Sequence, residues 1–100
     1  MSLSKHLAHS GVTANTISPG IILTPGVESF YRRVANEPGW GETWEQIEDG
    51  VLREFLDNPC GRLGRVDEVA DLVAYIASPR ADYINGANLR IDGGSTATVN

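Results

Sequence analysis

The sequence predicts an α/β fold in which two parallel strands are joined by helices. Residues 12–18 and 87–91 are short runs of β-branched and apolar side chains, which is typical of strands. Apolar residues at helical spacing occupy much of the chain between them. Two strands joined by a long helical crossover form a parallel pair with a right-handed connection. Because two parallel strands alone do not make a stable sheet, we expect this chain to be part of a larger α/β domain.

The first two predicted helices are short. Residues 2–9 carry Leu3 and Leu7 one helical turn apart and are followed by Ser-Gly, where glycine commonly ends a helix. This pattern indicates the end of a helix. Residues 27–36 read as a second short helix, ended by Pro38-Gly39.

The next two predicted helices are longer and more regular. Thr43 is a candidate N-cap with Gln46 three residues later, which is the spacing of a capping box. The helix that follows carries six apolar residues on one face: Trp44, Ile47, Val51, Leu52, Phe55 and Leu56. Residues 59–65 read as a loop. The last helix begins at residue 66, has an apolar stripe at Val69, Leu72, Val73 and Ile76, and is closed by Pro79.

The two predicted strands have polar and glycine-rich flanks. Asn15 lies in the middle of the first strand, and its amide needs hydrogen-bond partners if it is buried. The second strand follows Asn85-Gly86 and ends at Asp92-Gly93-Gly94. Glycines at both ends are typical of turns that delimit a strand.

Composition and charge exclude several classes of function. A net charge of -5 with scattered Lys and Arg argues against a nucleic-acid surface. No apolar run approaches the ~20 residues of a membrane span, and the N-terminus does not resemble a secretory signal. The single cysteine, Cys60, excludes a disulfide framework, so we expect a reducing cytoplasm and interpret this thiol as a bystander.

The loop after the first strand is the best candidate binding site. Ligands of open α/β sheets bind beyond the carboxyl ends of strands, and Pro19-Gly20 lies at such an end. Gly20 has no Cβ, so a flat ring can approach its backbone, and the backbone groups of Ile21 and Ile22 are available to a ligand amide. Thr24 adds a hydroxyl. The alternative is a loop that only packs apolar residues under a helix, and the pattern alone leaves both open.

Three stretches of the sequence together resemble a known family. They are "GVTANTISPGIILT", "GRLGRVDEVADLVAYIAS" and "YINGANLRIDGG", in this order and spacing. They resemble the C-terminal part of the short-chain dehydrogenase/reductase family, whose domain is a doubly wound, Rossmann-like parallel sheet. The resemblance implies that residues 1–100 correspond to the last two strands and their helices. It also implies an NAD- or NADP-dependent oxidoreductase acting on a small-molecule alcohol or ketone.

The resemblance also assigns roles to residues. Pro19 and Gly20 match the loop that backs the nicotinamide ring, and the backbone of Ile22 matches the group that bonds the carboxamide. Thr24 matches the hydroxyl near the carboxamide and diphosphate. Residues 25–58 match the substrate-binding lid. The turn after the last strand matches the subunit-interface side, so the resemblance implies a homo-oligomer.

Parts of the family's machinery have no counterpart in this sequence. It contains no glycine-rich phosphate loop and no match to the catalytic serine. The Tyr-x-x-x-Lys pair is also missing, because Ala35, Pro79 and Ala87 stand four residues after the tyrosines. Lys5 lies downstream of the position of the catalytic lysine. We therefore assign no catalytic residue and expect Met1 to begin the chain just after them, which makes the chain alone inactive. The alternatives are a noncatalytic interaction module or a truncated gene product.

The remaining polar and aromatic residues have competing interpretations. Aromatics gather in the lid region and predict an apolar pocket or a partner surface, or else the lid's own core: Phe30, Tyr31, Trp40, Trp44 and Phe55. His6 and His9 have no acidic or thiol neighbours, so we expect no metal site. Glu48, Glu54 and Asp57 read as a solvated helix face. Arg62 and Arg65 flank a glycine near a helix start, where they meet either a phosphate or a structural salt bridge.

Overall fold

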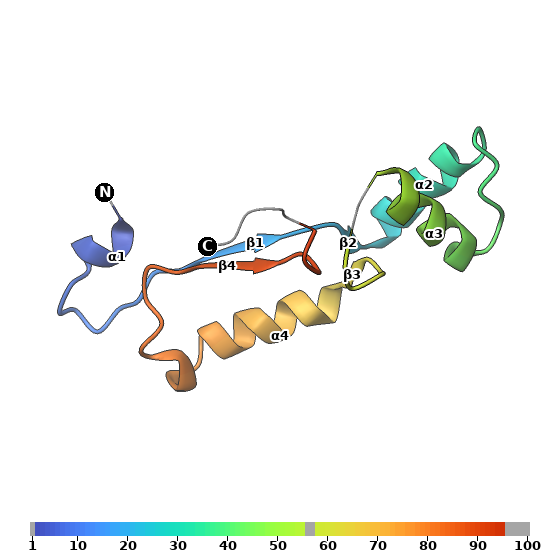
Figure 1. Cartoon of the computed structure of the whole chain (residues 1–100). Coiled ribbons are helices and arrows are strands. Elements are labelled where there is room, and N and C mark those ends of the chain that lie inside the picture. The colour runs from blue at the N-terminus through green and yellow to red at the C-terminus, as the bar shows by residue number, and fades with distance from the viewer. Residues whose placement is uncertain (1, 56–57, 96–100) are drawn as a thin grey trace.

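The computed structural model describes residues 2–55 and 58–95 of the chain. Figure 1 shows two parts: a pair of strands with a long helix beneath it, and a helical hairpin at the other end. The elements in chain order are α1 (Leu3–His6), β1 (Thr16–Pro19), β2 (Ile22–Leu23), α2 (Pro25–Ala35), α3 (Trp44–Glu54), β3 (Gly64–Arg65), α4 (Val66–Ile76), the 3-10 helix η1 (Pro79–Ala81) and β4 (Asn88–Ile91). We call α1, β1, α4, η1 and β4 the sheet body. We call the described part of residues 21–65, which contains β2, α2, α3 and β3, the hairpin body.

The predicted parallel pair is confirmed. β1 pairs with β4 in parallel, in a register that runs from Thr16 opposite Asn88 to Pro19 opposite Ile91. The predicted strand over 12–18 is displaced, since the ladder begins only at Thr16 and includes Pro19. Proline is tolerated here because Thr16 N and Gly20 N donate to the β4 side, which places the nitrogen of Pro19 on the opposite edge.

Two asparagines align the start of the ladder. The side-chain amide of Asn15 donates to the carbonyl of Ile84 at 3.0 Å, and its oxygen accepts from Ala87 N at 2.9 Å. Asn85 Oδ1 accepts from Ala14 N at 3.0 Å. Asn15 is half-buried and lies just before β1, not in the middle of a strand as predicted, and its side chain has partners on both its nitrogen and its oxygen. These bonds satisfy backbone groups before the regular pairing begins.

A second, very short ladder was not predicted. β2 and β3 are parallel, with Ile22 opposite Gly64 and Leu23 opposite Arg65. Gly64 N donates to the carbonyl of Ile21 at 3.1 Å. The prediction of a loop over 59–65 is thus wrong at its last two residues. Glycine is a poor strand former, and only a distant partner in the sequence makes this segment extended.

The helices agree with the sequence in type and differ at their ends. The capping box at Thr43 is confirmed, since Gln46 N donates to Thr43 Oγ1 at 3.2 Å and Thr43 N donates to Gln46 Oε1 at 3.2 Å. α2 starts two residues earlier than predicted because Pro25 fits the first helical position. α1 ends at His6, and His9 has a positive φ of 66°. Leu56, predicted for the apolar face of α3, lies outside the described residues.

The buried core lies in the hairpin body. Four of its residues are at most 2% exposed: Ala35, Ile47, Val51 and Leu63. Partly buried apolar residues pack around them, namely Ile21, Leu23, Val27, Tyr31, Trp40 and Trp44. The predicted stripe of α4 is less covered, since Val73 remains 49% exposed. With extents of 56 × 24 × 20 Å, the molecule is long and thin (Figure 1).

Candidate functional site

The loop predicted to bind the nicotinamide leaves the end of β1 and joins the two bodies. Gly20 N donates to the carbonyl of Ile91 at 3.0 Å, which extends the β1–β4 contact by one residue. A Cβ on Gly20 would lie 2.8 Å from Cβ of Asp92 and 2.9 Å from its Cα. Gly20 therefore lies so close to Asp92, just after β4, that any side chain at this position would clash. This reason for Gly20 differs from the one inferred from the sequence, which was access for a flat ring.

The backbone of Ile22 faces away from β3. The carbonyl of Ile21 accepts from Gly64, so it points toward β3. Alternate residues of an extended strand direct their amide and carbonyl groups to opposite edges. The amide and carbonyl of Ile22 thus point to the other edge of β2, where a ligand amide can pair with both.

Thr24 has a structural role of its own. Its Oγ1 accepts from Val27 N at 3.1 Å and so caps α2. Capping uses an oxygen lone pair and leaves the hydroxyl hydrogen free to donate elsewhere. The same side chain can therefore cap the helix and donate to a ligand.

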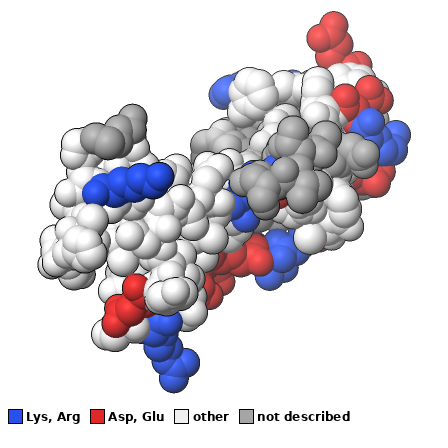
Figure 2. Space-filling model, turned by 60° about the vertical axis from the view of Figure 1, so that its left-hand side comes forward, with Lys and Arg blue, Asp and Glu red and all other residues white. Residues whose placement is uncertain are grey.

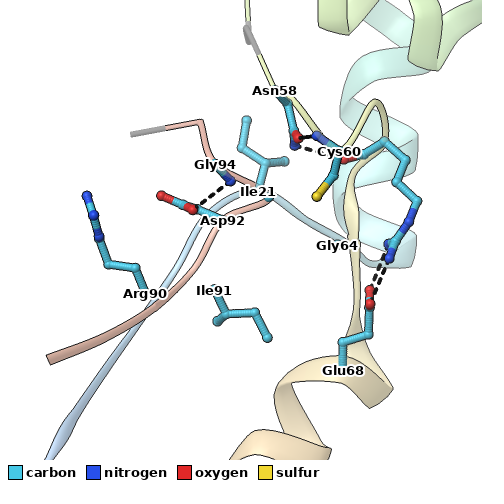
Figure 3. Close-up of a pocket in the computed structure, with 11 residues that line it drawn as sticks. Ile21, Asn58, Cys60, Gly64, Glu68, Arg90, Ile91, Asp92 and Gly94 are labelled. Carbon is cyan, nitrogen blue, oxygen red and sulfur yellow. Dashed lines mark hydrogen bonds and ion pairs between the residues drawn. The ribbon is translucent and has the colours of Figure 1, made fainter. Parts of the chain in front are cut away.

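A pocket of about 440 Å³ lies where the two bodies meet, as Figure 3 shows. From the hairpin side and the loop before β3 it is lined by Ile21, Asn58, Cys60, Arg62 and Gly64, and from the sheet side by Glu68, Arg90, Ile91, Asp92, Gly93 and Gly94. Ile21 belongs to the predicted cofactor loop. Pro19, Gly20, Ile22 and Thr24 are not among the described lining residues, so the loop passes beside this pocket.

Arg62 and Glu68 both line the pocket and form an ion pair, and Figure 3 shows Glu68 with the contacts of its carboxylate. The two guanidinium nitrogens donate to the two carboxylate oxygens at 2.8 and 2.7 Å. Arg65 N donates to the same carboxylate at 2.9 Å. The hydrogen bond from Arg62, followed by that from Arg65, lowers the pKa of Glu68 to about 2. Of the two interpretations of Arg62, the structural salt bridge is the one observed.

The loop that carries Arg62 is also tied to the end of β4. Cys60 N donates to the carbonyl of Gly93 at 3.1 Å and to Asn58 Oδ1 at 2.8 Å. Asn58 in turn donates to the carbonyl of Arg62 at 2.9 Å. Cys60 itself is an exposed free thiol. Its backbone therefore has a clear structural role in joining the two bodies.

Glu48 differs from its predicted role. It was grouped with Glu54 and Asp57 as a solvated face, but it is half-buried and its Oε2 accepts from Leu63 N at 3.0 Å. Glu54 is exposed, and Asp57 lies outside the described residues. Periodicity missed this contact because the partner is a backbone amide fifteen residues away in a loop.

Of the aromatic residues in the predicted lid, some belong to the segment's own core and others are exposed. Tyr31, Trp40 and Trp44 pack on the hairpin core. Phe30 and Phe55 are 51% and 60% exposed. A shallow pocket of about 380 Å³ is lined by Val34, Glu37, Pro38, Trp40, Glu54 and Phe55. The α2–α3 hairpin thus has its own core and also presents an apolar surface.

Figure 2 shows acidic and basic side chains interspersed between large uncharged areas on the face displayed. Over residues 2–55 and 58–95, no helix is long and apolar enough to cross a membrane. Within the same ranges, no three His, Cys, Asp or Glu side chains are grouped so that they could hold a metal ion.

Comparisons with known proteins agree with this architecture. A sequence model of the family described as enoyl-(acyl carrier protein) reductase matches residues 1–96. A diacetyl reductase that forms (S)-acetoin, from Staphylococcus aureus, is 34% identical over 91% of this chain and 33% of its own length. A 2,3-dihydroxy-2,3-dihydro-p-cumate dehydrogenase from Pseudomonas putida is 33% identical over 94% of this chain and 31% of its own length.

A solved structure shares the fold. The L-sorbose reductase from Gluconobacter frateurii, complexed with NADPH and L-sorbose, has a TM-score of 0.80 and 27% sequence identity. The match covers 97% of this chain and 35% of that protein. The relatives are named as reductases or a dehydrogenase, and this chain shares its Rossmann-like α/β fold with the solved structure. The chain belongs to the short-chain dehydrogenase/reductase family, and it spans about a third of the length of the relatives it matches.

Proposed function

We propose that this chain supplies the nicotinamide-side loop and the substrate lid of an NAD- or NADP-dependent oxidoreductase of alcohols or ketones. The observation that carries the proposal is the position of Ile22. It follows the carboxyl end of a parallel strand, and its backbone groups face the edge opposite β3. That is the end of the sheet where α/β proteins bind ligands.

The residues of the loop fit a nicotinamide group. Pro19 and Gly20 form the wall behind the ring, and the amide and carbonyl of Ile22 pair with the carboxamide. Thr24 donates its remaining hydroxyl hydrogen while it continues to cap α2. The cofactor supplies hydride chemistry, and these residues hold and orient its ring.

Residues 25–58 form the substrate lid in this proposal. The described part of this segment is mainly the α2–α3 hairpin, which has its own core and exposes Phe30 and Phe55. These two rings offer an apolar surface to a substrate with apolar parts. The substrate class rests on the relatives, whose names specify diacetyl and L-sorbose.

Catalysis needs groups that this sequence does not contain. Protonation of the developing alkoxide requires a general acid, and the sequence has no Tyr-x-x-x-Lys pair. We therefore propose that the hundred residues alone are inactive. We also propose that the protein that carries out the reaction is a cytoplasmic homo-oligomer. The rival function is a noncatalytic module that pairs with a full-length relative through the exposed edge of β1 or through β4, because unpaired edges favour association.

The binding role of Thr24 can be separated from its capping role. Thr24→Val removes both the hydroxyl and the cap, whereas Thr43→Val removes an equivalent cap on α3. In the protein that carries this chain, we expect Thr24→Val to weaken NADH or NADPH binding by about 3- to 10-fold. Thr43→Val should raise the dissociation constant less than Thr24→Val does. Equal effects of the two substitutions on binding would contradict a ligand contact at Thr24.

The inactivity of the isolated chain has its own assay. The purified hundred residues are mixed with NADH or NADPH and a carbonyl compound such as diacetyl, and absorbance of the reduced nicotinamide is followed. We expect no turnover. Carbonyl reduction above that of a preparation lacking the chain would overturn this part of the proposal.

A further inference from the structure

Glu48 connects the lid helix to the strand that supports the cofactor loop. Its side chain leaves α3 and its Oε2 accepts from Leu63 N at 3.0 Å. Leu63 is 2% exposed and belongs to the hairpin core. A carboxylate that accepts from a backbone amide makes a charge-assisted bond, which is stronger than a bond between neutral groups. The position of the peptide before Gly64 is therefore set by a side chain of the lid.

The next residue carries this constraint to the loop. Gly64 N donates to the carbonyl of Ile21 at 3.1 Å, and Gly64 stands opposite Ile22 in the parallel ladder. The contact is close, since a Cβ on Gly64 would lie 2.6 Å from Cδ1 of Ile22. A displacement of the Leu63–Gly64 peptide thus reaches Ile22 through one hydrogen bond and one side-chain contact.

A basic and an acidic side chain lie next to this contact. Arg62 adjoins Leu63, and its pKa is raised, first by the hydrogen bond and charge of Glu68 and to a lesser degree by the charge of Glu48. Asp49 lies next to Glu48 on α3 but pairs with Arg53 on the exposed side of the helix. Two adjacent acidic residues of one helix therefore have different surroundings, which provides a matched pair for experiments.

We propose that Glu48 is a positioning residue for the cofactor loop. It holds the Leu63–Gly64 peptide, this peptide holds β2, and β2 presents the backbone of Ile22 to the nicotinamide carboxamide. Movement of the lid helix is thereby coupled to the geometry of the cofactor loop. The last link rests on the proposed function, whereas the mechanical link from Glu48 to Ile22 does not.

Hydrogen exchange tests the mechanical link. We compare Glu48→Ala and Glu48→Gln with the adjacent controls Asp49→Ala and Asp49→Asn, in the full chain. Glu48→Ala should accelerate exchange in residues 20–24 and 60–66 by about 3- to 10-fold, and leave 88–91 unchanged. Glu48→Gln keeps an acceptor oxygen, so it should accelerate exchange less. The two Asp49 variants should match the unsubstituted chain.

Three exchange results would overturn the link. The first is unchanged exchange in both Glu48 variants, and the second is acceleration in 60–66 without acceleration in 20–24. The third is equal acceleration throughout the chain in Glu48→Gln, which would indicate only a general loss of stability. If Glu48→Ala does not fold, the comparison of Glu48→Gln with Asp49→Asn decides between these outcomes.

Dinucleotide binding tests the coupling to the cofactor. In the protein that carries this chain, Glu48→Ala should raise the dissociation constant of NADH or NADPH by about 3- to 10-fold, and Glu48→Gln should restore part of the affinity. Unchanged affinity in both variants would overturn the positioning role. If the unsubstituted protein binds neither dinucleotide, the proposed function fails, while the exchange result still decides the link from Glu48 to the loop.

Discussion

The hairpin body and the sheet body differ in how many of their apolar side chains are buried. The hairpin body holds the buried cluster of Ala35, Ile47, Val51 and Leu63, and its two helices have side-chain N-caps. In the sheet body, Ala81 is the only buried apolar residue among those described, and Val73 is half-exposed. The difference indicates that the hairpin is largely stabilised by its own residues. The sheet body has apolar surface left over for further packing.

The exposed apolar surface of the sheet body agrees with the family relationship. A pocket of about 710 Å³ lies between β1 and α4, lined in part by Val12, Ile17, Val73 and Ile76. Parallel sheets are normally covered on both faces and contain more strands than two. In the described part of the chain this sheet has two strands, so its apolar surface is available for packing against further protein.

The largest expected effect comes from shortening one β-branched apolar side chain to alanine in each body. Ile47→Ala should lower the free energy of unfolding by about 2–5 kcal/mol, because Ile47 is 2% exposed. Val73→Ala should change it by about 0.5 kcal/mol or less in this chain, since Val73 is 49% exposed. Urea unfolding followed by the fluorescence of Trp40 and Trp44 measures both. Similar losses would contradict the contrast between the two bodies.

An intermediate effect is expected at the start of the β1–β4 ladder. Asn15→Ala removes two hydrogen bonds and leaves Ala87 N and the carbonyl of Ile84 without that partner. The free energy of unfolding should fall by about 1–3 kcal/mol. The control is Asn36→Ala, at an exposed helix end. Thermal unfolding followed by circular dichroism compares them, and no difference between them would show that Asn15 does not align the strands.

The smallest effect is expected at the ion pair that joins the bodies. The pKa of Glu68 is about 2, against an ordinary value of 4.5. A carboxyl whose pKa falls on folding stabilises the fold above its unfolded pKa, and this contribution is lost as pH falls toward the folded value. The stability difference between the chain and Glu68→Gln should therefore be constant above about pH 5 and disappear toward about pH 2.

Measuring urea midpoints of both proteins from pH 7 to pH 2 tests this prediction. The pair is partly exposed, so the difference should also shrink at high salt. A difference that grows on acidification would have the wrong sign for a lowered pKa.

The sequence predicted the elements that depend on local signals. The capping box at Thr43, the start of α4 and the parallel β1–β4 pair agree with the structure. The β2–β3 ladder was missed, because a two-residue strand has no periodicity and exists only through its distant partner. α1 was predicted too long because an apolar spacing of one turn does not locate a helix end.

The candidate site could be predicted only in part. The position of Pro19 and Gly20 at the end of a strand followed from the pattern and is observed. The contact of Gly20 with Asp92 could not be predicted, because it depends on how two strand ends meet. Glu48 was missed because a charged residue on an amphipathic helix usually faces solvent, and its partner amide leaves no trace in the side-chain pattern.

The most direct test of the central claim is a hydrogen-exchange footprint of the cofactor. The protein that carries this chain is measured with and without saturating NADPH and NADH. The account predicts slower exchange within residues 19–24, centred on the amide of Ile22, and no change in residues 88–91. A protein that binds the dinucleotide without protecting 19–24, or that binds neither form, would contradict the assignment of this loop to the nicotinamide.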